Sequence, residues 1–199
     1  MKKIKLCGLT RPCDIEAANL CRPDYIGFVF AESRRRVSIP AARALRAQLA
    51  PGILPVGVFV RERPEVIAGL LEEGVIELAQ LHGGESEDDI LRLRTLTKKP
   101  IIRAVRVSCA EDIQTAAKTA ADFLLLDSGG GSGKTFPWEL IGRPEKPFFL
   151  AGGLSEENLS AALRTGAYAL DLSSGIETDG KKNAEKMRRI VTRMREEIL

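Results

Sequence analysis

Two residues of this sequence have the chemistry to move protons, and each closes a short apolar run. Cys7 lies in the segment 5–10 (Lys-Leu-Cys-Gly-Leu-Thr), and Asp127 ends the segment 123–127 (Phe-Leu-Leu-Leu-Asp). A thiolate can act as a base or nucleophile, and burial raises the pKa of a carboxyl group toward the range of a general acid. The alternatives are a small core cysteine and an aspartate that caps a turn. The apolar run before Asp127 favours the functional interpretation.

A glycine-rich segment follows Asp127. Residues 129–135 read Gly-Gly-Gly-Ser-Gly-Lys-Thr, which matches the end of a P-loop but not its first glycine, where Ser128 stands. A P-loop also needs a helix directly after its Lys-Thr, and Pro137 interrupts one. We therefore expect a lid over a phosphorylated ligand rather than a nucleotide site, with a plain surface loop as the alternative. The residues expected to contact that ligand are Gly131, Ser132, Gly133 and Lys134.

Two small-residue segments further along the chain could bind phosphate. Residues 151–155 read Ala-Gly-Gly-Leu-Ser, and residues 172–175 read Leu-Ser-Ser-Gly. Glycines allow backbone N–H groups to point at an anion, serine hydroxyls add donors, and a nearby helix N-terminus adds positive potential. Plain turns are the alternative. The candidate phosphate-binding residues are Gly152, Gly153, Ser173, Ser174 and Gly175.

A cluster of arginines and a single histidine complete the candidate set. Residues 34–36 are all arginine, and one guanidinium at a site could hold a carboxylate by paired hydrogen bonds. His82 has no partner that the sequence reveals, so we interpret it as a structural or supporting residue.

Composition narrows the class of protein. The 199 residues carry 30 basic and 27 acidic side chains, a net charge of +3 spread along the chain, which does not indicate nucleic-acid binding. Four cysteines without a Cys-x-x-Cys pair, beside one histidine, predict a reduced cytoplasmic protein without a metal site. The apolar runs are much shorter than the roughly 20 residues of a membrane span, and no signal peptide is evident.

The elements that must position these residues alternate between two periodicities. Apolar β-type runs predict strands at 4–7, 25–30, 55–60, 78–81, 101–107, 123–127, 148–151 and 169–172, and helical spacing predicts helices at 14–20, 41–49, 64–72, 87–96, 110–120, 155–163 and 183–198. Eight units of about 25 residues fit a minimal TIM barrel. We therefore expect one (β/α)8-barrel domain over 1–199, with a doubly wound sheet as the alternative. The candidate residues then follow strand ends, where such barrels carry their chemistry.

In order and spacing, these segments resemble the phosphoribosylanthranilate isomerase family along nearly the whole chain. The matching stretches are 5–10, 27–30 (Gly-Phe-Val-Phe), 56–60 (Val-Gly-Val-Phe-Val), 80–83 (Gln-Leu-His-Gly), 130–136, 152–154 and 171–177 (Asp-Leu-Ser-Ser-Gly-Ile-Glu). The resemblance implies an Amadori rearrangement in tryptophan biosynthesis, without metal or organic cofactor. It implies Cys7 as base, Asp127 as acid and Arg35 as the partner of the anthranilate carboxylate, with a slip to Arg34 or Arg36 left open.

The sequence departs from the family pattern in three places. Arg36 stands where tyrosine is frequent, Asn183 stands where aspartate is usual, and the stretch between Asp127 and the glycines is short. Alternatives are a related phosphosugar isomerase of histidine biosynthesis or a dual-substrate relative, a phosphate-binding protein without turnover, and an NTPase. Cys7 in the base position argues against the histidine-pathway enzyme, which usually has two aspartates. The expected partner is a small phosphorylated substrate, and the expected assembly is a monomer or homodimer.

Overall fold

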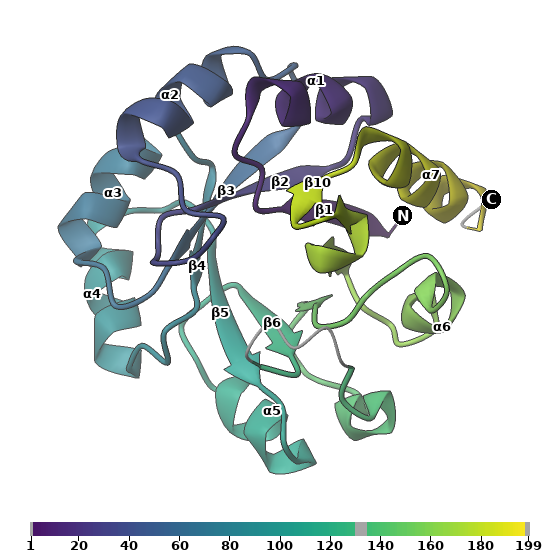
Figure 1. Cartoon of the computed structure of the whole chain (residues 1–199). Coiled ribbons are helices and arrows are strands. Elements are labelled where there is room, and N and C mark those ends of the chain that lie inside the picture. Colours follow the sequence, from purple (N-terminus) through teal and green to yellow (C-terminus); the bar gives the residue numbers. More distant parts are fainter. Residues whose placement is uncertain (1, 130–134, 198–199) are drawn as a thin grey trace.

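Eight parallel strands close into a barrel in the order of the chain (Figure 1). The structure is a computed structural model that describes residues 2–129 and 135–197. The strands are β1 (Lys3–Cys7), β2 (Tyr25–Val29), β3 (Leu54–Phe59), β4 (Leu78–Leu81), β5 (Ile101–Arg106), β6 (Phe123–Asp127), β7 (Phe148–Leu150) and β8 (Ala169–Leu172). The register of β1 against β8 pairs Lys5 with Asp171. This pairing closes the sheet, so the barrel prediction is confirmed and the doubly wound alternative is wrong.

Helices form a ring outside the barrel (Figure 1). They are α1 (Pro12–Cys21), α2 (Ile39–Ala47), α3 (Pro64–Glu72), α4 (Glu87–Leu96), α5 (Ala110–Ala116), α6 (Leu159–Leu163) and α7 (Ala184–Glu196). Ser86 caps α4, because its hydroxyl accepts the Asp89 N–H at 3.2 Å while the Asp89 carboxylate accepts the Ser86 N–H at 3.0 Å. This reciprocal pair is the capping box that stabilises helix starts.

Two helices are shorter than the sequence predicts. The helix expected at 155–163 begins only at Leu159, because the Asn158 side chain accepts the Ser155 N–H at 2.9 Å and donates to the Gly153 carbonyl at 2.9 Å. The helix expected at 110–120 ends at Ala116. Beyond it, the Ala120 N–H is taken by the side chain of Glu87 rather than by a helical carbonyl.

The alternation of side chains along each strand separates two apolar regions. Residues pointing outward, such as Ile4 and Leu6 on β1, pack with the helices. Residues pointing inward fill the lower barrel, and they include Val56, Leu125 and Phe149. Toward the carboxyl ends of the strands the interior becomes polar, with Lys5, Gln80 and Asp171 buried there. The candidate site therefore begins at the level of the barrel where the inward-pointing side chains change from apolar to polar.

Short elements replace regular helices after the last strands. The connection after β6 contains the 3-10 helix η1 (Trp138–Ile141), which agrees with the predicted lack of a helix directly after the glycine-rich segment. After β8 come the 3-10 helix η2 (Ser174–Ile176) and a hairpin of β9 (Glu177–Thr178) and β10 (Lys181–Lys182). Within the described ranges, no helix has both the length and the apolar character to cross a bilayer.

Candidate active site

A pocket of about 420 Å³ opens at the carboxyl ends of the strands. It is the place where a (β/α)8 barrel binds its ligands. Of the residues predicted from the sequence, those that line the pocket are Cys7, Arg35, Asp127, Gly152, Gly153, Ser173 and Ser174. The structure therefore brings the two proton-transfer candidates into one cavity, although they are far apart in the chain and belong to β1 and β6. Gly131, Ser132, Gly133 and Lys134 lie outside the described residues.

Cys7 is buried at the end of β1, where a neighbouring glycine makes room for its sulfur. A Cβ atom on Gly27, the residue paired with Cys7 in β2, would lie 2.5 Å from the Cys7 Sγ. Burial raises the pKa of the Cys7 thiol above its ordinary value, and the Asp171 carboxylate acts in the same direction. Lys5 and Lys182 oppose that shift by favouring the thiolate. The resting group is therefore a thiol with two lysines close enough to favour its ionisation.

Asp127 faces a histidine across the pocket. The His82 Nε2 lies 3.6 Å from the Asp127 Oδ2, a polar contact slightly longer than a hydrogen bond. Burial acts to raise the pKa of Asp127, but His82, the Gly129 N–H and the Ser128 hydroxyl outweigh it and hold the pKa below its ordinary value. Our expectation of a raised pKa is therefore wrong, because the carboxylate is surrounded by donors. The sequence revealed no partner for His82, and the structure supplies two, Asp127 and Gln80.

A glycine also makes room for Asp127. Gly152, in the loop after β7, has a φ of +84°, and a Cβ there would lie 2.5 Å from the Asp127 Oδ1. Any larger residue would press on the carboxylate as well as strain the backbone. The glycine predicted from sequence as a phosphate ligand thus also sets the space around the acid candidate.

Behind His82 lies a row of polar side chains that sequence reasoning missed. Gln80 Nε2 is 2.8 Å from His82 Nδ1, and Gln80 Oε1 accepts from Lys5 Nζ at 2.7 Å. Lys5 Nζ also donates to Asp171 Oδ2 at 2.8 Å. The available signal was the period of two along the strands, which places Lys5 under Cys7 and Gln80 under His82 on inward-facing positions.

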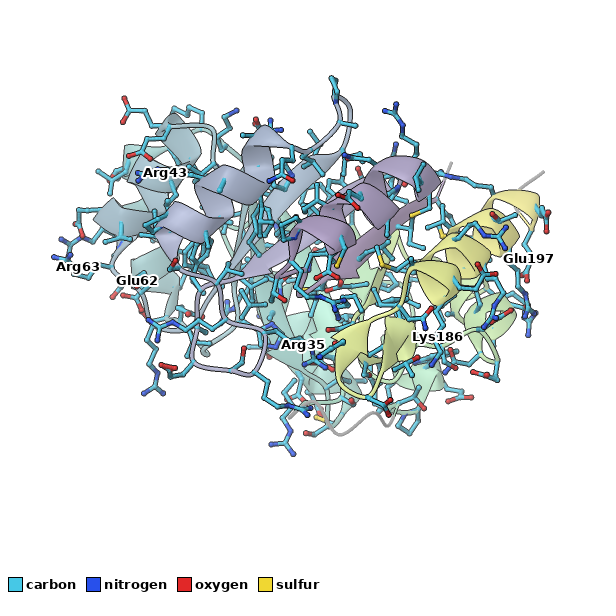
Figure 2. All side chains as sticks on the ribbon, turned by 45° about the horizontal axis from the view of Figure 1, so that its top comes forward. Arg35, Arg43, Glu62, Arg63, Lys186 and Glu197 are labelled. Atoms are coloured by element: carbon cyan, nitrogen blue, oxygen red, sulfur yellow. The ribbon has the colours of Figure 1, made fainter. Side chains whose placement is uncertain are left out.

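Arg35 is the arginine of the cluster that reaches the pocket. Its Nε donates to Glu177 Oε1 at 2.6 Å and its Nη2 to Glu177 Oε2 at 2.9 Å, and its stem packs against Gly8. Figure 2 labels Arg35 and Lys186, whose side chains reach Glu177 from the loop after β2 and from α7. Arg36 instead pairs with Glu32 on the exposed part of the loop. Arg34 does not line the pocket within the described parts of the chain, so the geometry favours Arg35.

The loops after β7 and β8 approach each other closely. Gly152 and Gly153 have φ angles of +84° and +65°, and a Cβ on Gly175 would lie 2.1 Å from the Leu154 carbonyl oxygen. The Ser173 hydroxyl donates to the Cys7 carbonyl at 3.2 Å. The predicted phosphate residues are thus adjacent, although α6 begins too late for its N-terminus to lie directly after Gly153.

Lys182 is a second lysine at the site that sequence reasoning did not select. It is buried on β10, and its Nζ donates to the Ser173 carbonyl at 2.9 Å and to Glu177 Oε1 at 2.6 Å. Burial lowers the pKa of Lys182, although Glu177 and Cys7 act to raise it. Lys182 and Arg35 share Glu177 as a partner. The β9–β10 hairpin therefore contacts both Arg35 and Ser173, and its Lys182 also acts on Cys7.

Comparisons with known proteins point to one family. The family model of N-(5'phosphoribosyl)anthranilate (PRA) isomerase matches residues 4–193. An N-(5'-phosphoribosyl)anthranilate isomerase of Endomicrobium trichonymphae is 45% identical over 193 residues, which cover 94% of this chain and 95% of that protein. The solved phosphoribosyl anthranilate isomerase of Thermus thermophilus is 36% identical, with a TM-score of 0.88 over 98% of this chain and 99% of that one. A phosphoribosyl anthranilate isomerase in complex with reduced 1-(o-carboxyphenylamino)-1-deoxyribulose 5-phosphate is 31% identical, with a TM-score of 0.85 over 98% of this chain and 100% of that one.

Proposed function

The chain belongs to the N-(5'-phosphoribosyl)anthranilate isomerase family, and from this premise we propose how its residues perform the family reaction. The reaction converts N-(5-phosphoribosyl)anthranilate to 1-(2-carboxyphenylamino)-1-deoxyribulose 5-phosphate, a step of tryptophan biosynthesis. The observation that supports our assignment of roles is that Cys7 and Asp127 share one pocket. A base and an acid on different strands can flank a sugar held between them.

Asp127 is the acid of the ring-opening step. Its carboxyl group gives a proton to the ring oxygen, the bond between that oxygen and the anomeric carbon breaks, and the nitrogen lone pair forms an iminium. The free protein favours the carboxylate form of Asp127, because His82 and nearby donors lower its pKa. A bound substrate brings the negative charges of its phosphate and carboxylate and also excludes water from the pocket. Nearby negative charge and loss of water each raise the pKa of a carboxyl group. On binding, the Asp127 carboxylate therefore takes up from solvent the proton that it then gives to the ring oxygen.

Cys7 is the base of the second step. Its thiolate takes the proton from carbon 2, and the released electron pair forms the carbon 1 to carbon 2 double bond while the iminium electrons return to nitrogen. The resulting enolamine loses its hydroxyl proton and gains one at carbon 1 to give the ketone. The iminium cation favours loss of the Cys7 thiol proton to solvent, which leaves the thiolate, and it acidifies the carbon 2 proton. Lys5 and Lys182 assist by opposing the effect of burial on the thiol.

The ends of the substrate bind on either side of the reacting carbons. We assign the anthranilate carboxylate to Arg35, whose guanidinium is held at the pocket by Glu177. We assign the phosphate to Gly152, Gly153, Ser173, Ser174 and Gly175. Paired hydrogen bonds to a guanidinium and backbone donors to a phosphate are the usual partners of these anions. The predicted contacts from 131–134 remain part of the proposal.

The test is the loss of anthranilate-type fluorescence when purified protein meets freshly made phosphoribosylanthranilate. Wild-type protein should remove the signal rapidly, and Cys7→Ser and Asp127→Asn should each nearly abolish turnover while they retain the fold and most of the ligand affinity. A fully active Cys7→Ser variant would exclude Cys7 as the base. No turnover by wild type would instead favour the histidine-pathway substrate or a binding protein.

We also propose a cytoplasmic enzyme that works as a monomer or homodimer. The free cysteines Cys7, Cys13, Cys21 and Cys109 fit a reducing compartment. Light scattering during gel filtration measures the assembly, and activity of an isolated monomer tests whether one chain suffices.

A further inference from the structure

A charged lysine is buried inside the barrel directly beneath the candidate site. Lys5 is 0% exposed, and the steps proposed above give it no direct contact with substrate. Its counterion Asp171 lies beside it on β8, 8% exposed. Burying an ion pair costs several kcal/mol of desolvation per ion, so an apolar pair is often as stable or more stable. Stability alone therefore does not account for a lysine at this position.

The Lys5 ammonium group donates to side chains on two other strands. An ammonium offers three donors. One goes to Asp171 Oδ2 at 2.8 Å and one to Gln80 Oε1 at 2.7 Å. The sulfur of Cys7 lies two residues further along the same inward face of β1, close enough for the charge of Lys5 to favour its thiolate. Lys5 thus acts on the base through its charge and contacts Gln80, the residue that holds His82.

The contact between Lys5 and Gln80 determines the state of His82. Because Gln80 Oε1 accepts from Lys5, the amide nitrogen of Gln80 must face His82 Nδ1, which lies 2.8 Å away. An amide nitrogen only donates, so Nδ1 accepts and the hydrogen of the neutral imidazole lies on Nε2. That nitrogen is the one facing Asp127 Oδ2, at 3.6 Å. One lysine therefore orders a chain of groups that ends at the acid.

We propose that Lys5 is a positioning residue for both proton transfers, because it stabilises the Cys7 thiolate and, through Gln80, selects the His82 tautomer that faces Asp127. The inference rests on the proposed roles of Cys7 and Asp127. The charged groups that face Cys7 are Lys5 on its own strand, Asp171 on β8, Lys182 on β10 and Arg35 on the loop after β2. Of these, Lys5 has the largest effect in favour of the thiolate. Burial lowers the pKa of Lys5, but Asp171 and Cys7 outweigh it and keep the lysine charged.

The first experiment measures the ionisation of Cys7 without substrate. Wild-type and variant proteins are alkylated with iodoacetamide across a range of pH, and the rate at Cys7 is read by peptide mass spectrometry, which separates it from the other cysteines. Lys5→Met keeps the side-chain length and removes the charge, so the midpoint for Cys7 should rise by about one pH unit or more. Asp171→Asn keeps the lysine and removes an anion, so the midpoint should fall. Lys3→Met, on the same strand but at the other end of the barrel, is the matched control and should leave the midpoint unchanged.

Opposite shifts from the two variants separate an electrostatic role from a general loss of structure. A Lys5→Met midpoint that equals or falls below that of wild type would overturn the proposal. If Lys5→Met does not fold, the tautomer of His82 in Gln80→Leu decides, because an unchanged tautomer there would contradict the role of Lys5 through Gln80. In turnover, Lys5→Met should lower kcat about tenfold for each unit by which the pKa rises, with KM nearly unchanged. Alkylation does not need turnover, so the two ideas are tested separately. A fully active Cys7→Ser variant would show that Cys7 is not the base, whereas an unchanged alkylation midpoint in Lys5→Met would show that Lys5 does not favour its thiolate.

The second experiment uses the fact that His82 is the one histidine of the sequence. Nitrogen-15 NMR of histidine-labelled protein reports which ring nitrogen carries the hydrogen. The wild type should show the Nε2–H tautomer, and Gln80→Leu or Lys5→Met should give a mixture of tautomers. Lys3→Met should keep the wild-type spectrum. An Nδ1–H tautomer in the wild type would overturn the proposed chain from Lys5 to Asp127.

Discussion

Arg35 and Glu177 form a two-bond ion pair at the edge of the pocket, with the Nε and one Nη of the guanidinium donating to the two carboxylate oxygens at 2.6 and 2.9 Å. One edge of the guanidinium is therefore already occupied. A substrate carboxylate can bind only the other edge, through Nη1 and the remaining hydrogen of Nη2. Glu177 thus fixes the orientation from which Arg35 meets its ligand.

We predict that Arg35→Ala raises KM by about 10- to 100-fold with a smaller change in kcat, because a hydrogen-bonded charged contact contributes about 1.5 to 3 kcal/mol. Arg35→Lys should recover only part of the affinity, since an ammonium cannot form the paired contact. Steady-state kinetics and titration with reduced 1-(o-carboxyphenylamino)-1-deoxyribulose 5-phosphate provide the measurements. Arg36→Ala is the control, because Arg36 pairs with Glu32 in an exposed position. A larger loss in that control would move the assignment to Arg36.

Glu177 should also make the free energy of unfolding depend on pH in the acidic range. Burial acts to raise its pKa, but Arg35 and Lys182 outweigh it and lower the pKa to about 2. The unfolded chain has a higher pKa, near the ordinary value of 4.5. A depressed carboxyl pKa stabilises the fold above the unfolded value and loses that contribution as the pH falls through the folded value. The affected range is therefore from about pH 4.5 down to about pH 2.

Glu177→Gln should be less stable than wild type at pH 7, because it leaves Arg35 and Lys182 without their carboxylate. The difference between the two proteins should shrink as the pH falls from about 4.5 toward 2. Urea unfolding at a series of pH values measures this. Glu72→Gln, at an exposed position at the end of α3, should follow the wild-type curve. A constant difference between Glu177→Gln and wild type over that range would contradict the prediction.

Gly27 should be needed for the position of the Cys7 sulfur. A Cβ on Gly27 would lie 2.5 Å from Cys7 Sγ and 3.1 Å from its Cα, so Gly27→Ala must displace the thiol or part the two strands. We expect kcat to fall at least about tenfold and unfolding to become easier by about 1 to 3 kcal/mol. In a Cys7→Ala background the sulfur is gone, so the same substitution should cost clearly less stability. Equal costs in both backgrounds would show that the sulfur is not what Gly27 accommodates. Gly69→Ala in α3, where a Cβ meets nothing within 4 Å, is the control and should not destabilise the protein.

The sequence was sufficient to locate those candidate residues whose position depends on a single strand. Cys7 and Asp127 were recognisable because each ends an apolar run, and a closed barrel brings all strand ends to one face. The partners of these residues were not recognisable, because they depend on register between distant strands. Lys5 meets Asp171 across 166 positions of sequence, and Gln80 across 75. A lysine in an apolar strand gives no sign of its counterion. The sequence likewise gives no sign that His82 lies beside Asp127, so the lowered pKa of Asp127 could not follow from it.

The pKa of Asp127 should depend on His82. Burial acts to raise that pKa, and His82 is the first of the groups that lower it. His82→Phe keeps a ring in the pocket wall and removes both nitrogens, so among the described residues the Gly129 N–H and Ser128 remain to oppose burial. We therefore expect the pKa of Asp127 to rise in this variant. A carbon-13 NMR titration of aspartate carboxyl groups measures the change, and the signal missing in Asp127→Asn identifies the residue. Asp112, which is held by the Ser108 and Cys109 N–H groups on the surface, serves as an internal control and should titrate alike in both proteins. An unchanged or lowered pKa of Asp127 would mean that backbone and hydroxyl donors, and not the imidazole, keep the acid ionised in the free protein.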